Sequence, residues 1–204
     1  MMKIENERWF NLLAIAALGT ALFALEKFSH PNIKAEENFT NEINASLFKS
    51  LLKPLVFKPV SISISKIGLK DVNIVEIGVE EDGRLETPSN YNEVGWYENG
   101  PKAGEEGNAI LAGHFDRPGG APAIFYNLVS LSEGDEVEVK DEVGKVRKFK
   151  VYEVSYVPVN DPESVTKAYE DSKEPIITLI TCGGVWDYKS QDYSKRLLVK
   201  ARRV

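Results

Sequence analysis

The pattern of apolar and polar residues divides the chain into three stretches. In the first, residues 9 to 25 (WFNLLAIAALGTALFAL) are uninterrupted by charge. At 1.5 Å per residue, a helix of this length spans roughly 25 Å, close to the ~30 Å hydrocarbon core of a bilayer. We therefore expect a cytoplasmic tip and a transmembrane helix over residues 1–29. A cleaved signal peptide is the alternative, although no small-x-small cleavage site follows Leu25.

The second stretch, residues 30–55, is polar at first and then amphipathic. Its apolar residues recur at spacings of three and four, which is typical of a helix that lies on a protein or membrane surface. Pro54 then ends this pattern. We expect a stalk with one short amphipathic helix, in which His30 is a solvated linker residue beside Pro31.

The third stretch, residues 56–204, changes to an alternation of period two. Short runs rich in β-branched residues predict strands, and glycine, proline or acidic turns separate nearly all of them. The predicted strands are residues 60–64, 72–77, 109–112, 137–139, 149–157, 176–181 and 197–199. Their number and spacing predict an all-β fold, either a sandwich or a closed barrel of about eight strands. The longest insertion, residues 158–175, is expected to hold one or two helical turns at 163–169.

Composition narrows the functional classes. The 204 residues suffice for one globular domain with an appendage. The net charge of −6 argues against a nucleic-acid partner, because binding to phosphates requires clustered Lys and Arg. The single cysteine excludes a disulfide within the chain and a multi-cysteine zinc site. The acidic turn at Glu133, Asp135 and Glu136 is expected to be solvated, and we predict no metal and no cofactor.

The single cysteine, Cys182, lies at the end of a predicted buried strand. Thr178 to Thr181 is an apolar, β-branched run, and Gly183 and Gly184 are expected to break the strand directly after the cysteine. A thiol at a strand end is positioned to react. Taken alone, however, a free cysteine is more often an inert core residue.

His114 also follows an apolar run, residues 109–112, and the two strand ends could meet across a sheet. A thiol with a pKa of about 8.5 is only a few per cent thiolate at neutral pH, and a neighbouring imidazolium raises that fraction. The same imidazolium can protonate a leaving group. The alternative is a strand-end histidine that bonds to a loop carbonyl.

Acyl transfer by a cysteine also needs a group that stabilises the oxyanion. The candidate is Arg196, which opens the last predicted strand. If residues 176–182 and 196–201 pair as neighbours, with residues 186–193 as the connecting loop, Arg196 lies near the cysteine. An arginine at a strand start is usually solvated, and other cations compete for the role. These cations are Lys195, Arg202 and Arg203.

Taken together, these residues resemble the sortases, a family of membrane-anchored cysteine transpeptidases. The matching motifs are Leu111 to His114, Thr178 to Cys182, and the arginine that opens the final strand. The resemblance covers roughly residues 56 to 204. Three further segments are similar to family motifs near the first strand and before the histidine: Ser63 to Leu69, Val94 to Tyr97, and Gly104 to Asn108. With Cys182-Gly183-Gly184 and the segment Gly120 to Tyr126, the chain is most like class F, and class E is next.

The resemblance implies a closed eight-stranded sortase-type β-barrel with short helices, located outside the cell and tethered by the N-terminal helix. Cys182 would attack the Thr–Gly carbonyl of an LPXTG-like sorting signal on a secreted protein and form a thioacyl enzyme. His114 would act as general acid and then as general base, and Arg196 would hold the substrate and the oxyanion. Ala112 and Thr181 would line the cleft. The acceptor would be an amine of a cell-wall precursor.

Two other functions stay open from the residues. One is a cysteine peptidase, which would hydrolyse the same acyl-enzyme with water. It stays open because no residue reveals the acceptor. A non-catalytic, membrane-tethered β-domain would bind wall polymer or a protein partner and keep Cys182 buried. The placement of the cysteine, the histidine and Arg196 at strand ends argues against this second alternative.

Overall fold

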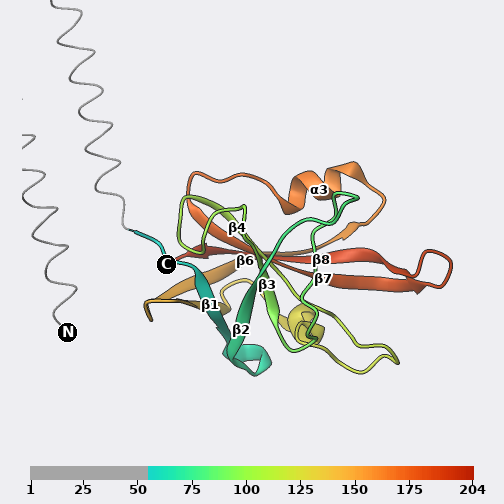
Figure 1. The fold of residues 1–204 in the computed structure, drawn as a ribbon, viewed down its shortest axis with the longest axis horizontal. Coiled ribbons are helices and arrows are strands. Elements are labelled where there is room, and N and C mark those ends of the chain that lie inside the picture. The colour runs from blue at the N-terminus through green and yellow to red at the C-terminus, as the bar shows by residue number, and fades with distance from the viewer. Residues whose placement is uncertain (1–54) are drawn as a thin grey trace, which may run out of the picture. The chain divides into compact units, whose positions relative to one another are not determined.

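The computed structural model describes residues 55–204, so the predicted transmembrane helix, the stalk and His30 lie outside the described residues. The eight strands of the described part close into a barrel in the order β1-β2-β3-β4-β7-β8-β6-β5 (Figure 1). Neighbouring strands run antiparallel, except for the parallel pairs β2–β3 and β4–β7. This topology confirms the predicted closed eight-stranded β-barrel.

Short connections join β1 to β2, β5 to β6 and β7 to β8, and long ones join β2 to β3, β4 to β5 and β6 to β7. The strands are β1 (Pro59–Ile64), β2 (Leu69–Ile77), β3 (Val94–Tyr97), β4 (Gly107–Ala112), β5 (Glu136–Asp141), β6 (Val146–Pro158), β7 (Pro175–Asp187) and β8 (Asp192–Arg203). The helices are the 3₁₀ turns η1 (Ser65–Ile67) and η2 (Tyr126–Ser130) and the α-helix α3 (Pro162–Ala168).

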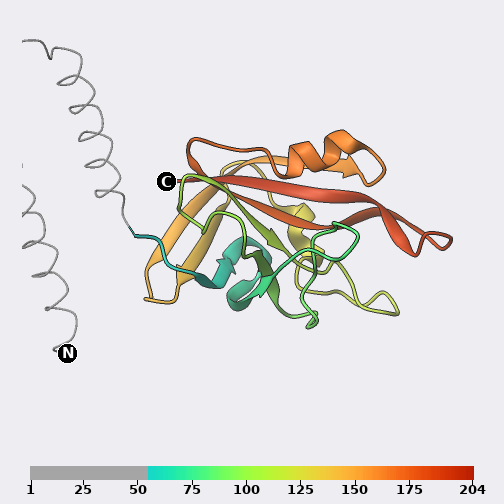
Figure 2. The same ribbon diagram turned by 45° about the horizontal axis from the view of Figure 1, so that its top comes forward.

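Burial along the strands explains the sequence pattern. In β5, Val137 and Val139 point into the barrel, and Glu138 and Lys140 beside them are more exposed, which is the alternation of a sheet with one solvated face. By contrast, every residue of β4 is buried. Near this part of the wall, Ala168 of α3 packs with Leu198 of β8 on the outer side of the barrel (Figure 2). The wall that carries β4, β7 and β8 is therefore the most deeply buried part of the barrel.

The predicted strands are all present, but β3 was not among them. β3 is only four residues long and contains Gly95, so the pattern rules give it little weight. The glycine is needed for packing, because a Cβ there would lie 2.7 Å from the side chain of Ile77 in the adjacent β2. The predicted helical turns in the long insertion are confirmed as α3. Asp161 caps this helix, since its carboxylate accepts a hydrogen bond from the Glu163 amide at 3.0 Å.

The prediction that β7 ends at Cys182 is wrong. The strand continues through Gly183 and Gly184 to Asp187, and the expected connecting loop 186–193 is mostly a hairpin whose strands β7 and β8 protrude beyond the barrel (Figure 1). The two glycines form a bulge instead of a break, because the register shifts between Gly183 and Trp186. Gly184 has a φ of +82°, which a residue with a side chain rarely adopts.

Candidate active site

The end of β4 lies beside the middle of β7, which brings the chain segments of the two predicted reactive residues together. Ala112 of β4 pairs with Ile180 of the parallel strand β7. Two further hydrogen bonds extend this pairing: the Gly113 amide donates to the Ile180 carbonyl at 3.0 Å, and the Thr181 hydroxyl donates to the Gly113 carbonyl at 2.7 Å. His114 directly follows Gly113, and Cys182 directly follows Thr181. The predicted meeting of these segments across a sheet therefore matches the observed pairing.

Arg196 lies directly across from Cys182. The two residues are register partners in the antiparallel pair β7–β8, so their side chains leave the same face of the sheet. Among the competing cations, Lys195 pairs with Gly183, Arg202 with Ile176, and Arg203 lies farther along β8. The observed register thus selects Arg196 as the cation nearest to the thiol.

The imidazole of His114 is held by a loop between β2 and β3. Its Nε2 lies 2.7 Å from the Pro88 carbonyl oxygen, and its ring stacks at a tilt against Tyr91 with centroids 4.5 Å apart. A carbonyl accepts only, so Nε2 carries a proton and the neutral ring has its lone pair on Nδ1. The bond to a loop carbonyl is the alternative that the sequence left open, but it also fixes the orientation of a base. Among residues 55–204, no hydrogen bond joins His114 to Cys182.

The Cys182 thiol is half-buried, and its surroundings disfavour the charged thiolate form. Burial raises the pKa of Cys182, the Arg196 guanidinium opposes this shift, and the carboxylates of Asp192 and Asp116 add to it. Burial disfavours the thiolate because the charged form loses hydration. The sequence suggested that an imidazolium would increase the thiolate fraction, but here burial is the largest influence. The resting protein therefore holds Cys182 mainly as a thiol, and a base must remove its proton before attack.

Ala112 and Thr181 were predicted to line the cleft, and both are almost fully buried in the described structure, with 4% and 3% of their surfaces exposed. Thr181 uses its hydroxyl internally, in the bond to the Gly113 carbonyl. Its role as a contact of substrate stays a prediction. Its position shows that it also joins the segment of His114 to the segment of Cys182.

Replacing Thr181 with valine should lower the free energy of unfolding by about 1–3 kcal/mol, because the buried Gly113 carbonyl loses its hydroxyl donor without access to water. Urea denaturation of the full-length chain measures the change. Thr181→Ser is the matched control, since it keeps the hydroxyl and loses only a methyl group. An unchanged denaturation midpoint for the valine variant would contradict this account.

Several groups near the site were not singled out from the sequence. The Tyr193 hydroxyl donates to Asp116 at 2.5 Å, and this bond raises the pKa of Tyr193 to about 12. The ring of Phe115 stacks on Tyr126 at 4.9 Å and meets Tyr193 edge-on at 5.5 Å. Phe115 and Asp116 follow His114 directly, which is the only sequence signal that could have suggested them. Their partners are distant in sequence, so only the fold brings them together.

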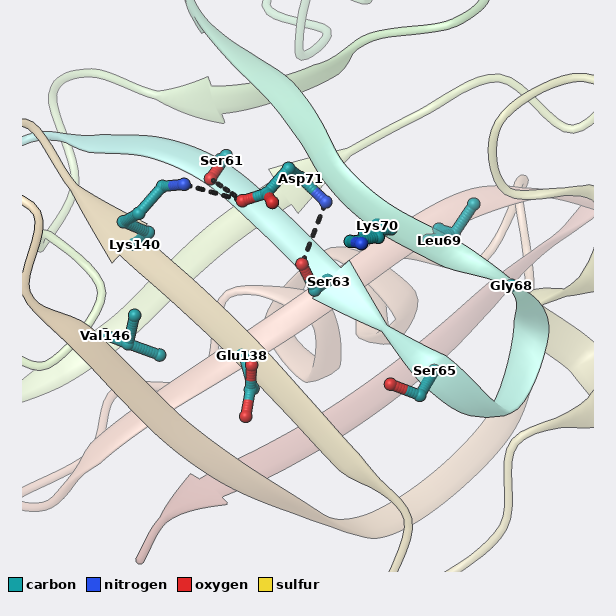
Figure 3. A pocket seen from close by; sticks show the side chains of 10 residues that line it. All are labelled: Ser61, Ser63, Ser65, Gly68, Leu69, Lys70, Asp71, Glu138, Lys140 and Val146. Carbon is teal, nitrogen blue, oxygen red and sulfur yellow. Dashed lines mark hydrogen bonds and ion pairs between the residues drawn. The ribbon is translucent and has the colours of Figure 1, made fainter.

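A cavity in residues 55–204 lies elsewhere, on the outer face of β1, β2 and β5 (Figure 3). It has a volume of about 600 Å³ and is lined mainly by polar groups, including Ser61 and Ser63 of β1, Ser65 of η1, and the Lys140–Asp71 ion pair of 2.6 Å. None of the predicted site residues lines it. The candidate active site is therefore not part of this cavity.

Residues 55–204 lack two other kinds of functional feature. No group of three or more His, Cys, Asp or Glu side chains in this range is arranged to hold a metal ion. Within the same range, no helix is both long enough and apolar enough to cross a membrane.

Comparisons with known proteins agree on one family. The model of the sortase domain matches residues 62–204. Among solved structures, the sortase D5 transpeptidase of Clostridium perfringens is 25% identical with a TM-score of 0.53, covering 82% of this chain and 94% of that chain. A lid mutant of sortase A from Corynebacterium diphtheriae is also 25% identical with a TM-score of 0.53, covering 74% of this chain and 73% of that chain.

A third structure supports the fold alone. Sortase C-1 of Actinomyces oris is 22% identical with a TM-score of 0.54, covering 77% of this chain and 81% of that chain. No curated protein sequence matches at a significant level. Since the family model spans most of the chain and the barrel matches that of several sortases, this chain belongs to the sortase family of cysteine transpeptidases.

Proposed function

We propose that this protein is a membrane-anchored sortase that cleaves an LPXTG-like sorting signal between Thr and Gly and transfers the acyl group to an amine of the cell wall. The observation that carries the proposal is the strand register, in which Cys182 pairs with Arg196 while the segment of His114 pairs with the segment of Cys182. A nucleophile, a base and a cation on neighbouring strand segments are the groups that acyl transfer needs.

The first chemical step moves a proton and forms a thioester. The Cys182 thiol gives its proton to the free lone pair of His114, and its sulfur attacks the carbonyl carbon of the Thr–Gly bond. The bond of His114 to Pro88 leaves Nδ1 as the acceptor in the neutral ring. The same proton then passes to the leaving amine, so the thioacyl enzyme forms and the peptide after Thr departs.

Arg196 supports this step through its charge. A negative oxygen develops as sulfur attacks, and a fixed cation stabilises it more in a partly desolvated site than in water. The guanidinium already opposes the rise in the pKa of Cys182, which is consistent with its closeness to the sulfur. In the second step an amine attacks the thioester, His114 accepts its proton, and the thiol is regenerated.

Membership of the sortase family supports our proposals for the substrate and the location of the protein. For one structural neighbour, sortase C of Streptococcus pneumoniae, the crystal structure gave insights into pilin substrate specificity. For this chain we propose a secreted protein as substrate, a cell-wall precursor amine as acceptor, and a catalytic domain outside the cell, anchored by residues 1–29. The motifs around Cys182 and after His114 favour class F, with class E next.

Mass spectrometry of Cys182 after incubation with a panel of sorting peptides tests the proposal. We expect a thioacyl adduct in which the protein gains the mass of the peptide fragment that ends at Thr, less one water, and a transfer product when an amine is added. Hydrolysed peptide that persists with the amine present would favour a cysteine peptidase. The absence of an adduct with every peptide, in a folded protein, would contradict the proposed reaction.

A further inference from the structure

The side chain of Arg196 folds back along its own strand instead of extending freely. Its Nη2 donates to both carboxylate oxygens of Asp192, at 3.0 and 2.8 Å. Its Nη1 contacts the carbonyl oxygens of Tyr193 and Lys195, at 3.3 and 3.2 Å. A guanidinium has five N–H groups, and these four contacts all use its two terminal nitrogens. The Nη end is therefore occupied by the protein itself.

Asp192 is well placed to act as this anchor. It begins β8 at the hairpin, and its Oδ1 also accepts a hydrogen bond from the Tyr193 amide at 2.7 Å. The backbone thus orients the carboxylate that holds Arg196. The ion pair is only partly solvated, with 28% of the Arg196 side chain and 33% of the Asp192 side chain exposed. Two contacts from one carboxylate restrict the guanidinium more than a single surface contact would.

We infer that Asp192 is a positioning residue of the proposed reaction, which holds Arg196 beside Cys182 and sets the charge that the thiol experiences. The inference rests on the proposed function of Arg196. It adds a residue that neither the motifs nor the family match singled out.

Several charged and titratable groups face the thiol from the surrounding elements. Arg196 and Asp192 come from β8, and Asp116 follows β4, where it accepts the hydrogen bond from Tyr193. His114 lies two residues after the end of β4, on the chain segment next to that of Cys182. Of these groups, Asp192 is the one whose carboxylate binds the cation opposite the sulfur. Its removal changes both the position and the net charge of this cluster.

Removing the Asp192 carboxylate should have two effects: it slows the reaction, and it makes the Cys182 thiol ionise more readily. Loss of the anchor lets the guanidinium move, and a small misplacement of a charge-stabilising group slows a reaction by about 10- to 100-fold. Loss of the negative charge leaves Arg196 unopposed, and the thiol then ionises at a lower pH. A residue with a merely structural role would show neither the second effect nor a loss confined to kcat.

The test compares Asp192→Ala and Asp192→Asn with Asp187→Asn in the full-length chain. Asp187 is the register partner of Asp192 but bonds only within the hairpin turn, through Lys189 and Ser190, so it is the matched control. Two quantities are measured: the pH midpoint of Cys182 alkylation by iodoacetamide, and kcat and KM for the sorting peptide that forms an adduct.

We expect a fall in kcat of about 10-fold or more for Asp192→Ala, with KM changed less than about twofold. Asp192→Asn keeps one acceptor oxygen, so its kcat should fall less than that of Asp192→Ala. In both variants the alkylation midpoint should move to lower pH, whereas Arg196→Ala should move it to higher pH because the opposing cation is gone. Asp187→Asn should match the wild type in both measurements.

The outcomes separate this inference from the proposed function. If Arg196→Ala lowers kcat but both Asp192 variants retain it, the positioning role is wrong and the proposed function stands. If no peptide reacts, the alkylation midpoints alone decide, because they need no substrate: unchanged midpoints in both Asp192 variants overturn the inference. Should Asp192→Ala fail to fold, Asp192→Asn carries both measurements.

Discussion

Replacing Cys182 with alanine should abolish transfer of an LPXTG-type peptide to an amine and leave the fold intact. The chain has no second cysteine that could form the thioester, so the loss should be on the order of 10³-fold or more. The thiol is only half-buried and makes no hydrogen bond within residues 55–204, so its removal should cost little stability. Chromatography of the transfer product and a thermal unfolding curve measure the two effects.

Two results would argue against this role of Cys182. Transfer by the alanine variant at a measurable rate would show that another group attacks the substrate. A variant that is inactive because it is unfolded would shift the explanation to stability, and Cys182→Ser then serves as the second variant. Serine fits the same space but is a much weaker nucleophile at neutral pH, so it should fold and remain nearly inactive.

Replacing His114 with alanine should slow formation of the thioacyl adduct by about 10²- to 10⁴-fold, the usual contribution of a general acid and base. The reason is that burial keeps Cys182 protonated, so the reaction depends on a base at the end of β4. Rapid-quench mass spectrometry of the adduct measures the rate. The Cys182 thiol should still react with iodoacetamide at high pH, where hydroxide supplies the base.

The other histidine of the chain provides the control. His30→Ala should have the same adduct rate as the wild type, because we expect that residue to be a solvated linker. An unchanged rate for His114→Ala, together with a lower unfolding temperature, would favour the alternative in which His114 only binds the loop through the Pro88 carbonyl. The two histidine variants thus distinguish a catalytic from a structural role.

The sequence by itself indicated the all-β class and supplied the three candidate residues. Strand alternation in segments such as residues 149–157 depends on nearest neighbours along the chain, so it can be read without coordinates. The residue types at Cys182, His114 and Arg196 carry their own chemistry. His114 follows the end of β4 as predicted, whereas Cys182 lies within β7 instead of at its end and Arg196 lies within β8 instead of at its start. Short or glycine-containing segments were harder: the pattern does not reveal β3, and the bulge at Gly183 and Gly184 has the composition of a strand end.

Only the tertiary structure decided how these groups meet and what surrounds them. The pairing of Cys182 with Arg196 depends on the β7–β8 register, which hydrogen bonds between strands set and local pattern does not. The raised pKa of the thiol arises mainly from its burial in the folded barrel. The bonds of His114 to Pro88 and of Arg196 to Asp192 likewise depend on side-chain directions in the folded barrel. Residue types therefore indicated the chemistry, and strand packing determined its geometry.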